Sequence, residues 1–307
     1  MQQRRTPPLD IDIRPLPAKR AVVEGESFAV DIEAVAERDV VADQVVLEVV
    51  QVIDYGYGRT NLHGVIYTAR DRSTHVISQQ PLPPAGRVMA GETYRTRAVV
   101  TVPALNLPSV RGELISISWI LRVRMSAQDD SESVGEGMFT VQSAAAGCSS
   151  DAAQDPETTV EWTASLELVE LSGRILTNAT PITGRLRVAP RHGALRSVRV
   201  ELVMLEAVAY GPTPAGQSGE RPQKHPRHTE NTIVTTTVTE GLPAAGAEAV
   251  IPFEVATPRF LPSPSLDSGR FRVRWELRIT ADVPHRPDPQ LRVGLVAVTA
   301  PQAAHSS

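Results

Sequence analysis

Hydrophobic and polar residues alternate with a period of two along much of the chain. From 115 to 123 every second residue is apolar, and from 271 to 279 the same pattern recurs with Arg or Glu in each alternate place. Because residues i and i+2 share one face of a strand, Trp119 and Trp275 are expected in a core while the arginines face water. Shorter stretches of the same kind occur at 28–34, 182–188 and 198–204.

One segment fits two periodicities. Residues 40–53 have apolar residues that would also fall near one face of a helix, but their β-branched content favours a strand. The chain contains 25 prolines and 20 glycines spread throughout, which leaves few windows for a long helix. Many short strands separated by turn residues predict an all-β protein built from β-sandwiches.

The chain also repeats itself once. Val45–Gly56 corresponds to Val200–Gly211, and the Leu-Pro-x-Ala-Gly segment at 82–86 corresponds to the one at 242–246. Pro103 and Trp119 match Pro258 and Trp275, and all four separations lie between 155 and 160 residues. A period this long indicates two copies of one domain rather than a solenoid, whose repeats are a few tens of residues long.

The duplication predicts the domain boundaries. We expect an N-terminal immunoglobulin-like sandwich at 1–143, a linker rich in Ala, Gly and Ser at 144–158, a C-terminal sandwich at 159–300 and a disordered tail at 301–307. The polar stretch 211–229 is expected to be a loop inserted in the second copy.

Composition and charge exclude several classes of protein. The formal charge of −4 and the presence of only two lysines argue against a nucleic-acid binder and against direct binding to anionic lipid. The N-terminus lacks the apolar stretch of a signal peptide, and no run approaches the roughly 20 apolar residues that span a bilayer. Cys148 is the single cysteine and has no basic neighbour to activate it. These features lead us to expect a cytoplasmic protein.

A proline-rich segment precedes the long tryptophan strand in each half. The first reads Val-Pro-Ala-Leu-Asn-Leu-Pro-Ser from 102 to 109, and the second reads Thr-Pro-Arg-Phe-Leu-Pro-Ser-Pro-Ser from 257 to 265. Two tandem all-β halves with this feature resemble the arrestin fold family, which includes arrestins, retromer Vps26 subunits and bacterial sporulation-control proteins. The composition, rich in Ala, Val and Arg, is similar to that of a bacterial member.

The resemblance implies a non-catalytic scaffold that binds other proteins, often the cytoplasmic parts of membrane proteins. The chain departs from the family in having no Pro-Pro-x-Tyr motif and no visible clathrin-binding tail, so these roles are not transferred. The partner is therefore expected to be a protein of unknown identity, and any membrane association would be peripheral and would depend on that partner.

The stretch from Asp54 to Gly64 is expected to form a loop, and it is the best candidate binding site. Tyr55, Tyr57, Arg59, Asn61 and His63 lie among glycines, and Tyr and Arg are the residues that dominate binding hot spots. The alternative is purely structural: the glycines would turn a hairpin and Tyr55 would fill the edge of the core. The third glycine and following helix that a phosphate-binding loop requires are absent from the sequence.

No motif predicts catalysis, a metal or a cofactor. His225 and His228 lack further ligands nearby in the sequence, and Ser218 does not lie in a Gly-x-Ser-x-Gly motif. We therefore expect no enzymatic activity, and a cytoplasmic adaptor that binds through sheet edges, concave faces or loops, with homodimerisation through a sheet edge as a related possibility. The alternative is a module that binds a small ligand or a glycan.

Overall fold

The computed structural model describes residues 11–61, 63–105, 107–127, 131–143, 157–159, 163–209 and 224–299. The regular elements in these ranges are all strands, which confirms the all-β prediction. Most of the expected linker, with Cys148, lies outside the described residues, as do residues 211–223 and the tail from 301. The long alternating segments form strands because each can bury one face while the other stays in water.

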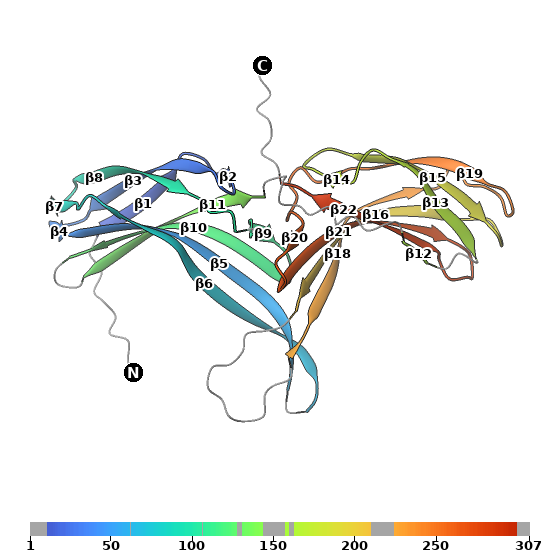
Figure 1. The fold of residues 1–307 in the computed structure, drawn as a ribbon, viewed down its shortest axis with the longest axis horizontal. Helices are drawn as coiled ribbons and strands as arrows, with labels where there is room; N and C mark the ends of the chain where they lie inside the picture. The colour runs from blue at the N-terminus through green and yellow to red at the C-terminus, as the bar shows by residue number, and fades with distance from the viewer. Residues whose placement is uncertain are drawn as a thin grey trace, which may run out of the picture. The chain divides into compact units, whose positions relative to one another are not determined.

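The chain separates into two compact units (Figure 1). The first comprises Met1–Tyr55, Asp71–Val110 and Ser116–Gln142. The second comprises Gly56–Arg70, Arg111–Ile115 and Ser143–Ser307, so it takes two segments from the N-terminal half of the sequence.

The first unit is organised around a three-stranded antiparallel sheet and a larger sheet in which β2 pairs parallel with β11. The three-stranded sheet has the order β1 (Ile11–Pro17), β3 (Ser27–Ala36), β8 (Thr93–Thr101). The larger sheet contains β5 (Gln44–Thr60), β10 (Ile115–Ser126), β11 (Glu132–Gln142) and β2 (Ala21–Val23), with β6 (Ile66–Leu82) on β5 and β9 (Val110–Arg111) on β10. A small pair is formed by β4 (Val40–Ala42) and β7 (Gly86–Val88).

The second unit has the same order of pairings. Its three-stranded sheet is β13 (Ala164–Leu171), β15 (Ile182–Pro190), β19 (Ala249–Val255). Its larger sheet has the order β12 (Glu157–Thr159), β22 (Gln290–Ala297), β21 (Phe271–Asp282), β16 (Ser197–Val208), β18 (Arg227–Val238), with β14 (Ile175–Leu176) on β22 and β20 (Leu266–Asp267) on β21. The short β17 (Lys224–His225) pairs with Gly58 and Arg59 at the end of β5.

Each unit buries its tryptophan as the alternation predicts, although the alternate positions are not all in water, since Glu276 is 8% exposed. Trp119 on β10 is 0% exposed and Trp275 on β21 is 1% exposed. In the first unit, β1 packs against β11 so closely that a Cβ on Gly135 would overlap the carbonyl oxygen of Ile13. Glycine at this position therefore lets two layers approach each other, and the arrangement is β-sandwich-like.

The tryptophan of each unit also anchors the proline-rich segment that precedes its strand. The indole nitrogen of Trp119 donates to the carbonyl of Leu107 at 3.2 Å, and that of Trp275 donates to the carbonyl of Ser263 at 3.2 Å. A buried indole N–H needs an acceptor, so each Trp both fills the core and fixes the segment before its own strand.

A serine that follows a proline makes a second matched contact. The N–H of Ser109 donates to the carbonyl of Val141 at 2.8 Å, and the Ser109 hydroxyl accepts from the Val141 N–H at 2.9 Å. The N–H of Ser265 donates to Ala297 at 2.9 Å, and its hydroxyl accepts from the Ala297 N–H at 2.8 Å. Each proline-rich segment is thus joined to the last long strand of its own unit.

Candidate functional site

The candidate residues lie at the end of the β5–β6 hairpin. The sequence predicts a loop from Asp54 to Gly64, but β5 continues as a strand to Thr60, and the turn that follows is closed by a hydrogen bond from the N–H of Asn61 to the carbonyl of Val65. The interpretation as a loop is therefore wrong for most of this stretch. The reason is tertiary: β6 pairs with β5, and β17 pairs with Gly58 and Arg59 near its end.

Gly58 is a packing residue rather than a turn residue. A Cβ at this position would lie 2.9 Å from the Cβ of His225, which occupies the neighbouring strand β17. The Thr60 hydroxyl lies 2.8 Å from Nε2 of the same histidine. Together these contacts hold His225 against the hairpin.

Asn61 shapes the turn itself. Its Oδ1 accepts the N–H groups of His63 at 2.9 Å and Val65 at 3.0 Å, while its own N–H donates to the carbonyl of Val65 at 3.0 Å. Gly64 has a φ of 76°, a conformation that glycine adopts without steric cost. The Asn61 side chain is therefore occupied by the local turn, as is common for Asn in such positions.

The two tyrosines have different environments. Tyr55 is 3% exposed and its hydroxyl donates to Oδ2 of Asp71 at 2.9 Å, so its ring belongs to the core of the first unit. Tyr57 is half-buried. Of the residues singled out in the sequence, Arg59, Asn61 and His63 are the exposed ones.

The three residues that follow the turn were not predicted as part of the site. Val65, Ile66 and Tyr67 are 57%, 50% and 42% exposed, although they are consecutive apolar side chains. Since neighbouring residues of a strand point to opposite faces, apolar side chains are open to solvent on both faces of the ribbon. An apolar triplet directly after a turn glycine, without polar alternation, is the signal that could have identified them. We call Tyr57, Arg59, His63, Val65, Ile66 and Tyr67 the hairpin tip.

A buried carboxylate lies near the hairpin tip in the second unit. Glu206 on β16 is 1% exposed, and its side chain accepts the N–H groups of Glu113 at 2.8 Å, Leu114 at 3.0 Å and Ile115 at 2.9 Å. The amide of Asn231 on β18 donates to the same carboxylate at 3.1 Å. These donors replace the water that a charged group loses on burial.

The segment that Glu206 holds also supports the hairpin. The N–H of Gly56 donates to the carbonyl of Leu114 at 2.8 Å, and Nη2 of Arg70 donates to that of Glu113 at 3.3 Å. The base of the hairpin end is therefore fixed to residues 113–114, which Glu206 fixes in turn. This chain of contacts gives the hairpin tip a defined support within the second unit.

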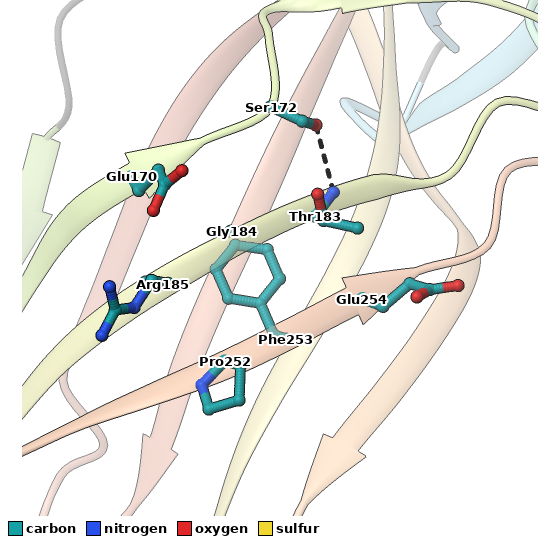
Figure 2. A pocket seen from close by; sticks show the side chains of 8 residues that line it. All are labelled: Glu170, Ser172, Thr183, Gly184, Arg185, Pro252, Phe253 and Glu254. Atoms are coloured by element: carbon teal, nitrogen blue, oxygen red, sulfur yellow. Dashed lines mark hydrogen bonds between the residues drawn. The ribbon is translucent and has the colours of Figure 1, made fainter.

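A shallow, open groove lies on the three-stranded sheet of the second unit. It has a volume of about 580 Å³ and is lined from β13, β15 and β19. Figure 2 shows the Phe253 ring lying across Gly184, with Glu170, Arg185 and Glu254 around it and the Ser172 hydroxyl bonded to the N–H of Thr183. The groove combines carboxylates, a guanidinium and hydroxyl groups, while the Phe253 ring itself is buried.

The described residues include no group of three or more His, Cys, Asp or Glu side chains that could hold a metal ion. Of the two histidines considered as metal ligands, His228 lies on β18. The part of the chain that the structure describes has no helix long and apolar enough to cross a membrane. Comparisons with known protein families and with curated proteins find no match to this chain. The inference of function therefore depends on the hairpin tip, the groove and the exposed strands.

Proposed function

We propose that the protein is a non-catalytic cytoplasmic scaffold of the arrestin-like kind, and that it binds a protein partner through the hairpin tip. The observation that carries the proposal is the exposure of Val65, Ile66 and Tyr67 beside Arg59 and His63. Contiguous exposed apolar residues rimmed by polar ones are typical of protein interaction sites.

The fold part of the proposal is a duplicated immunoglobulin-like sandwich. It is supported by the equal order of strand pairings in the two units. The matched hydrogen bonds of Trp119 and Trp275, and of Ser109 and Ser265, support it independently, because each pair is separated by 156 residues in the sequence. Two tandem sandwiches are what the resemblance to arrestins implies.

The energetics favour the apolar triplet over the polar residues as the source of affinity. Complete burial of one large aliphatic side chain contributes about 1.5–3 kcal/mol, and Val65, Ile66 and Tyr67 are each about half exposed. Burying the remainder contributes on the order of 1 kcal/mol per residue. Arg59 and Tyr57 would add orientation through hydrogen bonds at the rim.

The proposal is tested by capturing partners from the cells of origin after mild cross-linking, using the wild-type chain and two variants. Ile66→Asp introduces a charge in the hairpin tip, and Val134→Asp on β11 is the matched control, since Ile66 and Val134 are each 50% exposed. We expect one protein, recovered by the wild type and by Val134→Asp, to fall at least tenfold with Ile66→Asp. If both variants recover the partner protein equally well, the hairpin tip is not the binding site.

The groove favours a second candidate function, the binding of a small ligand or glycan. The hydroxyl and charged groups that line it are groups that bind sugar hydroxyls. We expect such a ligand to raise the melting temperature of the wild type in a screen of neutral and acidic oligosaccharides, and to have no effect on the variant Arg185→Ala/Glu254→Ala. If no sugar in the screen raises the melting temperature of the wild type, the ligand-binding function is rejected and only the scaffold proposal remains.

A further inference from the structure

The outer strand β18 has an open edge. It is the last strand of its sheet and pairs with β16 from Val198↔Val238 to Val208↔Arg227. Within the described part of the chain, no strand pairs with its other side. An outer strand presents a row of backbone N–H and C=O groups that another strand can bind.

A register shift at Ile233 interrupts this edge, and beyond it the side chains of the strand carry no feature that prevents such pairing. From Asn231 to Thr239 the chain has no charged residue, no proline and no glycine, and it is rich in Thr, Val and Ile. Natural sheet proteins commonly protect long edges with charges or proline. β18 lacks both from Asn231 to its end at Val238.

The corresponding outer strand of the first unit is different. β6 lies outside β5, and it contains Arg70, Asp71 and Arg72 in succession and Pro81 near its end. Two edges with the same place in the strand order therefore differ in protection, so the absence of charge from Asn231 to Val238 is a property of this part of β18 rather than of the architecture.

The sequence of the β18 edge is complementary to itself in the antiparallel direction. If two copies pair with Thr236 opposite Thr236, then Thr235 lies opposite Thr237, and Val234 lies opposite Val238. Thr235 and Thr237 are exposed, while the other three are half-buried on the opposite face. Thr–Thr and Val–Val pairs are favourable cross-strand neighbours, and this register sets Glu240 opposite Thr232 rather than opposite another acid.

We propose that β18 is a homodimerisation edge, and that two copies of the chain join antiparallel about a two-fold axis at Thr236. The interface is isologous, so one strand supplies both sides, and the large sheets of the two second units become one continuous sheet. A second copy is the occupant that the edge fits, because the uncharged, self-matching segment from Asn231 to Val238 offers no group that would select a charged peptide. The edge lies outside the hairpin tip, so the dimer does not depend on the proposed partner site.

Sedimentation of the full chain over a range of concentrations tests the proposal. We expect a monomer–dimer equilibrium in the wild type. The variant Thr235→Lys/Thr237→Lys places introduced lysines opposite each other in both cross-strand pairs, and should raise the dissociation constant roughly tenfold. The matched variant Thr235→Glu/Thr237→Lys places opposite charges there and should dimerise at least as tightly as the wild type.

A disulfide provides an independent measurement of the register. In a Cys148→Ser background, Thr236→Cys should form a covalent dimer on mild oxidation, because directly opposed residues in antiparallel strands have Cα atoms about 4.5–5.5 Å apart, within disulfide range. Thr74→Cys, exposed on the charged β6 edge, is the control and should remain reduced. If the wild-type chain is monomeric at every concentration, the proposal is wrong. If the chain dimerises but none of these substitutions changes the dimerisation, the proposal is also wrong, because the dimer then forms through another surface.

Discussion

Removal of the Glu206 carboxylate is the perturbation whose effect the structure specifies most fully. Three backbone N–H groups, from Glu113, Leu114 and Ile115, donate to this side chain at 2.8–3.0 Å, and the site is buried. In Glu206→Ala these donors lose their acceptor while remaining inside the protein. A buried donor left unsatisfied costs about 1–3 kcal/mol, so three of them predict a loss of about 3–5 kcal/mol after partial relaxation and entry of water.

The variant Glu206→Gln separates the loss of charge from the loss of shape. The amide retains one oxygen, which can still accept from Leu114 and Ile115, but its NH₂ group faces the N–H of Glu113. We expect a smaller loss of about 1–3 kcal/mol. Glu201→Ala on the same strand is the control, because Glu201 has one ion-pair partner, Arg199 at 3.4 Å, and such pairs are worth at most about 1 kcal/mol.

The assay is urea unfolding of the full chain combined with hydrogen exchange at residues 113–115. Both Glu206 variants should accelerate exchange in this segment, and the order of destabilisation should be Ala, then Gln, then the Glu201 control. The geometry of Gly112 adds a second test, since a Cβ there would overlap the Glu206 carboxylate. Gly112→Ala should therefore cost less in the Glu206→Ala background than alone. Equal exchange protection in wild type and Glu206→Ala would refute the reasoning.

Three further predictions concern packing, the matched anchors and pH. Gly135→Ala should destabilise the first unit by about 1–3 kcal/mol in urea unfolding, because its Cβ would overlap the Ile13 carbonyl, whereas Gly173→Ala, with open space around it, should be nearly neutral. Ser109→Ala and Ser265→Ala should each cost about 1–2 kcal/mol, since each removes an acceptor for a backbone N–H, and a large loss at one site with none at the other would contradict their equivalence. The Ala90 N–H and then Arg87 hold the pKa of Asp39 below its ordinary value of 3.8, so its stabilising contribution should be present above that value and be lost as the pH falls through the lowered pKa. An NMR titration of the Asp39 carboxyl with a midpoint at or above 3.8 would show that these contacts do not favour the charged form.

The candidate site was only partly accessible from the sequence. The stretch from Asp54 to Gly64 is recognisable by its Tyr, Arg and Gly content, but glycines in such a run suggest a loop. Gly58 instead lies in a strand because β17 passes directly beside it. Tyr55 and Tyr57 have the same spacing from glycine in the sequence, yet the first is buried and the second half-buried.

Local periodicity by itself determined the alternating strands of this protein and the buried positions of its two tryptophans. A period of two follows from strand geometry alone, so the burial of Trp119 and Trp275 could be predicted from their neighbours in the sequence. Tertiary structure alone decided that Glu206 is buried beneath residues 113–115, that Val65, Ile66 and Tyr67 are exposed, and that β18 is an outer strand. These features depend on whether segments distant in the sequence pack against a residue and provide it with hydrogen-bond donors or apolar contacts. A local pattern of residues does not contain that information.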